Sequence, residues 1–374
     1  MNIRRTTRQL LMLCRSAVRA QAYDGELADV KDLYTVAHNH GLSASLYYTL
    51  YDIVEDKESL CAFREAHDRM RHIVITQSQQ LSRLFRLFEA GGIRLLHMPL
   101  ENMHAADPEG ISLLDERVRL FVDASALTRA EALLLDNGFS QIREDRESRL
   151  YLLSPYFVLD LSTIPSGDGT PHDQGLCRAW ERATKKDGYA LVYEMTERDS
   201  YILLLCRMYA QLPDHTPPIA QVLRIGMLYE RLCSSGEDAI AREWLCMNHL
   251  DSFAEVIRRF YGAWIYEEEL TPTLAVLAEL TAMANMYKNL EEYLRESNEG
   301  RSSLAYLFLP YVKMRLAHPV CLSPLLYPLG LVLRVIHLCA RKLERVSSAT
   351  NASRGGIADA TYRTLWKAVN VNID

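Results

Sequence analysis

Two closely spaced arginines offer the clearest chemistry in this sequence. Arg117 and Arg119 lie in the run 117–122, whose apolar residues are typical of a β-strand. Side chains two positions apart in a strand point to the same face, so both guanidinium groups are expected to face one way. Guanidinium matches the oxygens of phosphate and of carboxylate, which leaves two hypotheses. The pair binds a phosphate-bearing ligand, or it forms ion pairs with Asp115, which has the same strand parity, and with Asp160 in a second predicted strand.

Other well-known catalytic patterns are absent from the sequence. It contains no G-x-x-x-x-G-K-[ST], G-x-G-x-x-G, G-x-S-x-G or H-E-x-x-H motif. No cluster of further metal ligands accompanies His38 and His40, and we interpret them as a pair at a helix end. The eight cysteines include no C-x-x-C pair, which favours reduced cysteines in a cytoplasmic protein.

The composition indicates a chain with a large core and no nucleic-acid surface. Its 374 residues are 49% hydrophobic, enough for two or three domains. The net charge is −6 and the 42 lysines and arginines are spread along the chain, which argues against DNA or RNA as a partner. The longest apolar stretch, 319–340, is interrupted by Pro324, Pro328 and Arg334, so no transmembrane span is expected.

The elements that would position the two arginines form a small α/β module. Apolar spacing predicts helices at 73–90 and 126–136, the second capped by Asp123 or Ser125. Strands are predicted at 93–96, 117–122, 149–153 and 157–161. The order is helix, strand, strand, helix, strand, strand. Further helices are predicted at 32–38, 43–51, 196–212, 221–233, 239–248, 252–264 and 274–294.

We therefore expect an α+β fold, in which a small mixed-sheet module is embedded in a mainly α-helical chain. The predicted divisions are an N-terminal helical region at 1–72, the module at 73–170, a C-terminal helical domain at 171–346 and a tail at 347–374. The tail is weakly patterned, and we expect it to be partly disordered.

Four segments of this pattern resemble the bacterial family of uncharacterised nucleotidyltransferases. They are Leu33–Leu42 with Leu46-Tyr47, Gly92–Leu96, Leu120–Asp123 with Ala130–Phe139, and Pro310–Val312 with Pro319, Leu322–Pro324 and Arg334. The likeness extends over residues 10–345 of the chain. It implies the polymerase-β-like nucleotidyltransferase fold for the module. It also implies a transferase that moves a nucleoside monophosphate from an NTP to an acceptor.

The resemblance further implies a metal site, and this chain departs from it. Enzymes of the fold hold Mg²⁺ with D-x-D on one strand and a third acid on a neighbouring strand. The D-x-D positions fall on Arg117 and Arg119, the third acid falls on Asp160, and a lysine-glycine pair of the family falls on Met98-Pro99. A guanidinium cannot ligate a metal, and at about 4 Å it would repel each positive charge by about 4 kcal/mol at an effective dielectric near 20. We predict that no metal binds here and that no cofactor is required.

Three hypotheses for the function follow. The leading one is a catalytically impaired nucleotidyltransferase-like protein that binds a nucleotide, another phosphate-bearing ligand or a protein partner, with Arg117 and Arg119 on the phosphate. The second is an active enzyme in which a shifted acidic set, Asp115 and Asp160, binds Mg²⁺ and NTP. The third is a helical interaction protein whose α/β module is only structural.

Overall fold

The computed structural model describes most of the chain up to residue 283. The described residues are 3–27, 29–98, 117–144, 148–153, 157–163, 178–212, 216–283, 286, 327–328 and 330–334. Several predicted features lie outside them, namely Asp115, Pro99, the segment 310–324 and the tail at 347–374.

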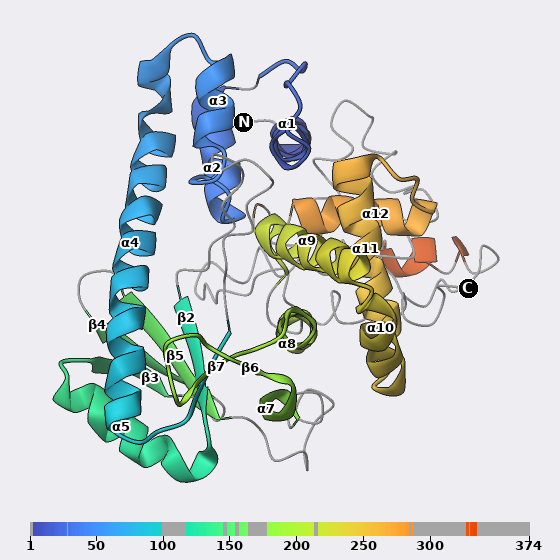
Figure 1. The fold of residues 1–374 in the computed structure, drawn as a ribbon. Helices are drawn as coiled ribbons and strands as arrows, with labels where there is room; N and C mark the ends of the chain where they lie inside the picture. Colours follow the sequence, from blue (N-terminus) through green and yellow to red (C-terminus); the bar gives the residue numbers. More distant parts are fainter. Residues whose placement is uncertain are drawn as a thin grey trace, which may run out of the picture.

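The N-terminal part is helical, as predicted. Helices α1 (Ile3–Val18), α2 (Val30–Asn39) and α3 (Tyr47–Ile53) lie together at one end of the molecule (Figure 1). The carboxylate of Asp29 caps α2 by accepting the backbone N–H groups of Lys31 and Asp32. The helix is followed by Gly41, whose φ of +70° favours glycine at that position.

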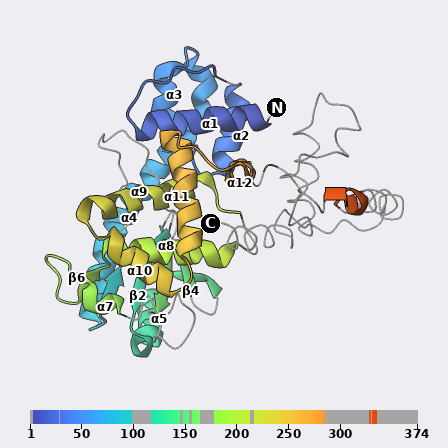
Figure 2. The same ribbon diagram turned by 90° about the vertical axis from the view of Figure 1, so that its right-hand side faces the viewer.

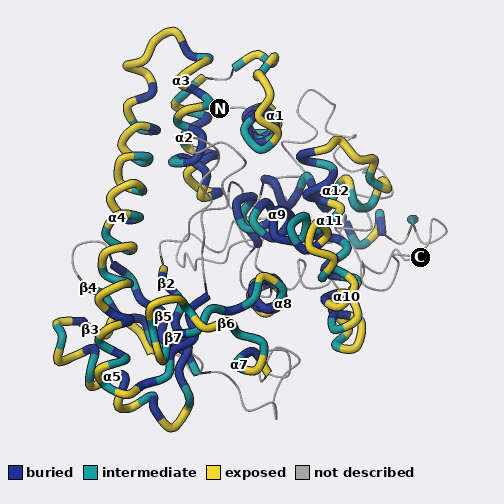
Figure 3. The backbone as a smooth tube through the Cα atoms, in the orientation of Figure 1, coloured by how far each residue is buried: buried dark blue, intermediate teal, exposed yellow. Residues whose placement is uncertain are grey.

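A single long helix joins this end to the sheet. A short 3-10 turn, η1 (Lys57–Leu60), leads into α4 (Cys61–Ala90), which begins well before the predicted residue 73. Phe63 packs into the core of the helical region, whereas Leu84, Phe85 and Phe88 pack against the sheet. Between these two contacts the helix is mostly exposed or half-buried (Figure 3). The early start therefore lets one helix contribute to two cores.

Seven strands form one mixed sheet in the order β3-β4-β5-β2-β1-β7-β6. They are β1 (Leu95–His97), β2 (Arg117–Val122), β3 (Ser140–Glu144), β4 (Ser148–Leu153), β5 (Phe157–Thr163), β6 (Thr184–Lys185) and β7 (Val192–Glu194). Strand β2 is parallel to β5 and antiparallel to β1, and β1 is parallel to β7. This mixed sheet within a mainly helical chain confirms the predicted α+β class.

The sheet is larger than the sequence pattern indicates. Strands β3, β6 and β7 were not predicted: every residue of β3 is exposed, and β6 and β7 are two and three residues long. A strand is recognised by alternating or continuous apolar residues, and these segments have too few of them. Because β7 pairs with β1, the sheet extends past the predicted module boundary at residue 170.

Helices cover the two faces of the sheet. Val118, Leu120 and Val122 of β2 face α4 and α5 (Leu127–Asp136). Phe121 faces the other way, toward α7 (Ala179–Arg182) and α8 (Glu197–Gln211). The alternation along β2 therefore places Arg117 and Arg119 on the α8 face, together with Phe121.

The predicted cap of α5 is wrong. Neither Asp123 nor Ser125 caps it, because a 3-10 turn, η2 (Ala124–Ala126), precedes the helix and Ala126 occupies the N-cap position. No side chain forms a capping hydrogen bond at the start of η2 or at the start of α5. The far end agrees with the prediction, since Asn137 follows the helix and Gly138 has a φ of +85°.

A second core lies in the helical part of the chain. Helices α9 (Ile219–Ser235), α10 (Asp238–Met247), α11 (Asp251–Tyr266) and α12 (Pro272–Ala282) pack with α1, α2 and α8 (Figure 2). The helix predicted at 274–294 ends earlier, at Ala282. Gly226 lies where α9 meets α11, and a Cβ there would come within 2.1 Å of the Tyr261 ring. Within the described residues, no helix has both the length and the apolar character needed to cross a membrane.

Candidate functional site

The candidate site lies on β2 and β5, on the face that α8 covers. The parallel pairing places Arg119 opposite Asp160 and Arg117 opposite Val158. The Asp160 residue is 5% exposed and the side chain of Arg119 is 11% exposed, whereas Arg117 is exposed. The two arginines therefore share a face but differ in surroundings, since only Arg119 lies in the interior.

Both carboxylate oxygens of Asp160 have partners. Oδ2 lies 3.8 Å from Nε of Arg119 and 3.2 Å from Nη1 of Arg207 on α8. Oδ1 accepts a hydrogen bond of 3.0 Å from Oγ of Ser162. A strand neighbour, a helix and a hydroxyl thus hold this carboxylate in one orientation.

Arg207 is a site residue that the sequence analysis missed. It lies one helical turn after Leu203, which packs against the sheet, and this spacing places both residues on one face of α8. The sequence did contain a signal, because Arg207 is the one charged residue in the apolar run 202–208. A charge in such a run needs a partner once it is buried.

Further contacts fix the start of α8. Thr196 caps the helix by accepting the backbone N–H of Asp199 at 3.1 Å, at the predicted position. The Asp199 carboxylate is 1% exposed and accepts hydrogen bonds of 3.1 and 3.0 Å from Nε of Arg182 in α7. These contacts tie α8 to α7 and so help to position Arg207 over the sheet.

The described residues do not fit a magnesium site. Nowhere in the part of the chain that the structure describes do three His, Cys, Asp or Glu side chains gather as metal ligands. The carboxylate of Asp160 is bounded by two guanidinium groups, which donate hydrogen bonds only and remain charged. Mg²⁺ requires several oxygen ligands in octahedral geometry, and one carboxylate between two arginines offers too few. The alternative acid, Asp115, lies outside the described residues.

A separate ionic group lies on the opposite face of the sheet. Glu194 of β7 forms an ion pair with Lys186, and its carboxylate lies 3.9 Å from Nδ1 of His97. The neighbouring His97 and Lys186 lower the pKa of Glu194 to about 2, although burial opposes the change. The His97 ring also contacts Phe85 of α4. This group fastens β1, β7 and α4 to one another on the face of the sheet opposite Asp160.

Comparison with known proteins gives a match at the level of the family. The family model described as "uncharacterised nucleotidyltransferase" matches residues 26–262. The matched region includes the whole sheet and extends from before α2 into α11. No curated protein and no solved structure matches the chain.

Proposed function

The chain belongs to the uncharacterised nucleotidyltransferase family, and we propose that it binds the phosphates of a nucleotide beside Asp160 without performing two-metal nucleotidyl transfer. The observation that supports this is the contact of both Arg119 and Arg207 with the Asp160 carboxylate. By the family resemblance, Arg117 and Arg119 fall where active enzymes of the fold present carboxylates to a metal.

Arginine can take over part of what a metal does at such a site. A bound Mg²⁺ neutralises phosphate charge, and a guanidinium does the same through charge-assisted hydrogen bonds. Each guanidinium has five N–H donors in a planar fork, so it can contact a carboxylate and a phosphate oxygen together. Arg117, exposed on the same face, is placed to add a further contact at the surface.

Binding of this kind would not restore catalysis. Two-metal transfer needs an ion that activates the attacking oxygen and one that stabilises the leaving oxygen. Arginine carries a charge but cannot lower the pKa of a coordinated hydroxyl, because it has no coordination position to offer. We therefore propose a nucleotide-binding protein with impaired transferase activity.

Calorimetric titration of the full chain with each NTP, in EDTA or in Mg²⁺, tests this proposal. We expect binding in EDTA that added Mg²⁺ does not strengthen. Arg119→Gln should weaken it about tenfold or more, since a charged hydrogen bond contributes about 1.5–3 kcal/mol. Arg83→Gln, which removes an exposed arginine of α4, serves as the control and should leave binding unchanged.

Two results would contradict the proposal. Binding that depends on Mg²⁺ would instead favour the active enzyme with Asp115 and Asp160 as ligands. No binding of any NTP would favour a structural ion-pair cluster and a protein that acts through a protein partner. The double variant Arg117→Asp/Arg119→Asp gives a further check, because two carboxylates at these positions should create a dependence on Mg²⁺ that the native chain lacks.

A further inference from the structure

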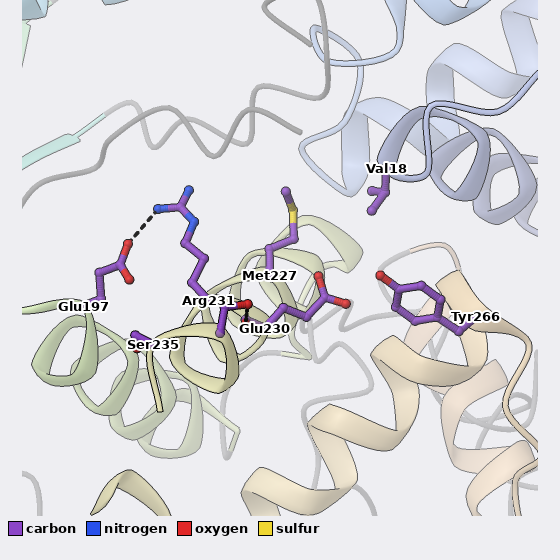
Figure 4. A pocket seen from close by; sticks show the side chains of 8 residues that line it. Val18, Glu197, Met227, Glu230, Arg231, Ser235 and Tyr266 are labelled. Carbon is purple, nitrogen blue, oxygen red and sulfur yellow. Dashed lines mark hydrogen bonds and ion pairs between the residues drawn. The ribbon is translucent and has the colours of Figure 1, made fainter. Parts of the chain in front are cut away.

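The helical part of the chain contains a pocket that is separate from the Asp160 cluster. Its volume is about 520 Å³, within the range of small-molecule sites. Figure 4 shows that its side chains come from the end of α1, the start of α8, the second half of α9 and the end of α11. They are Val18, Glu197, Met227, Glu230, Arg231, Ser234, Ser235 and Tyr266.

The charges of this pocket leave one carboxylate for a ligand. Nη1 of Arg231 donates a hydrogen bond of 3.0 Å to Glu197, so these two charges largely neutralise each other. Glu230 is different, because its partners are neutral. Its Oε2 accepts a hydrogen bond of 2.9 Å from the hydroxyl of Tyr261, and the hydroxyl of Tyr266 points toward it (Figure 4).

Tyr261 remains a hydrogen-bond donor to Glu230, and Tyr266 stays neutral beside it. Burial raises the pKa of Tyr261, and so does the neighbouring charge of Glu230. Burial and the nearby Glu230 carboxylate likewise raise the pKa of Tyr266. The carboxylate is thus oriented by the Tyr261 hydroxyl, which carries no compensating positive charge.

The other hydroxyls of the pocket can only accept hydrogen bonds. Oγ of Ser234 donates its hydrogen to the backbone oxygen of Glu230 at 2.9 Å, and Oγ of Ser235 donates to that of Leu232 at 3.1 Å. A hydroxyl has one hydrogen and two lone pairs, so both groups present lone pairs to a ligand. The pocket is therefore richer in acceptors than in donors.

The ring of Tyr266 already has a cationic neighbour. The guanidinium carbon of Arg19 lies 5.8 Å from the centre of that ring, within the range of a cation–π contact. Met227 and Val18 add apolar surface on the same side of the pocket, near Glu230 and Tyr266 (Figure 4). Together with the Glu230 carboxylate, this apolar surface suits a ligand with positively charged nitrogen atoms joined by methylene groups.

We propose that this pocket binds a small organic cation rich in N–H donors, of the polyamine class. One ammonium group contacts the Glu230 carboxylate. The methylene chain packs on Met227 and Val18, and further N–H groups reach the oxygens of Ser234 and Ser235. The site is independent of nucleotide binding at Asp160.

The test is calorimetric titration of the full chain with spermidine at physiological salt and without nucleotide. Tetramethylammonium is the comparison probe, because it carries a positive charge but no N–H donor. We expect it to bind at least tenfold more weakly than spermidine. Glu230→Gln keeps an oxygen for Tyr261 and should weaken spermidine at least tenfold, whereas Glu243→Gln on the exposed face of α10 should not change the affinity.

A second variant covers the case in which Glu230→Gln impairs folding. Val18→Lys adds an ammonium group at the half-buried end of α1, where it competes for Glu230, and it should also abolish spermidine binding. Three results would overturn the proposal. They are no spermidine binding to the native chain, equal binding of the two probes, and unchanged affinity in the folded variants.

Discussion

Replacing Asp160 by asparagine tests the arginine cluster most directly. Asparagine has nearly the same shape, and its side-chain oxygen can still accept the hydrogen bond from Ser162. The substitution therefore removes one negative charge and little else. It leaves Arg119 and Arg207 facing a neutral amide.

The loss of stability can be worked out from the two contacts. At an effective dielectric near 20, the attraction of Asp160 is about 5 kcal/mol to Arg207 at 3.2 Å and about 4 kcal/mol to Arg119 at 3.8 Å. Hydration offsets part of this loss, more for Arg207, whose side chain is 24% exposed, than for Arg119 at 11%. Breaking a buried ion pair costs about 3–5 kcal/mol, and we expect a value near the lower end, about 3 kcal/mol.

Urea denaturation followed by circular dichroism measures this difference in unfolding free energy. Asp238→Asn is the matched control, because it removes the same charge from an ion pair with Arg242, whose side chain is 63% exposed. Such a surface pair contributes about 0.3–0.5 kcal/mol. The Asp160 variant should therefore be destabilised several times more than the control. A loss below about 1 kcal/mol would show that the charges around Asp160 are hydrated and not buried.

The same variant tests the proposed phosphate site. The negative charge of Asp160 repels a phosphate bound to the same two guanidinium groups, so its removal should strengthen anion binding. Pyrophosphate should then raise the melting temperature of Asp160→Asn more than that of the native chain, since a ligand stabilises the state that binds it. Equal shifts in the two proteins would place the anion elsewhere and refute the reasoning.

Three further predictions concern the rest of the chain. Burial lowers the pKa of His40 from 6.5 to about 4, so between these pH values the imidazole is protonated in the unfolded chain only. The free energy of unfolding should therefore decrease by roughly 3 kcal/mol from pH 6.5 to 4. In urea titrations, His40→Asn should remove this part of the pH dependence. Gly226→Ala forces a methyl group into the Tyr261 ring and should cost about 3 kcal/mol of unfolding free energy in the same assay. Burial raises the pKa of Cys14 and of Cys206 to about 12, so neither thiol should react with iodoacetamide in the native chain. Mass spectrometry should find the exposed cysteines labelled, namely Cys61, Cys233 and Cys246.

The central strand of the site could be predicted because its pattern is local. Val118, Leu120 and Val122 alternate with other residues, and the observed β2 has the predicted limits. The strands that the sequence analysis missed depend on their neighbours. β7 pairs with β1, which is distant in sequence, and β3 has no buried residue to mark it. Pairing of this kind leaves no periodic signal in the strand itself.

The limits of the helices follow the same rule. The predicted start of α8 at Thr196 is confirmed, because the capping hydrogen bond to Asp199 joins residues three apart. The start of α4 was placed too late, since its first turns are stabilised by Phe63 packing into the helical core. Contacts between distant parts of the chain decide such limits, and a single sequence does not reveal them.

The position of Arg207 shows where sequence reasoning about the site stops and what the structure adds. An arginine in an apolar run implies a buried partner, but that partner, Asp160, is 47 residues away. A buried ion pair contributes little to stability compared with apolar side chains of similar size. Neutralising Asp160 needs one positive charge, so a purely structural role gives no physical reason for both Arg119 and Arg207 to converge on this face. A phosphate-bearing ligand gives one, because a guanidinium can hold Asp160 in the unliganded state and donate to phosphate oxygens in the bound state.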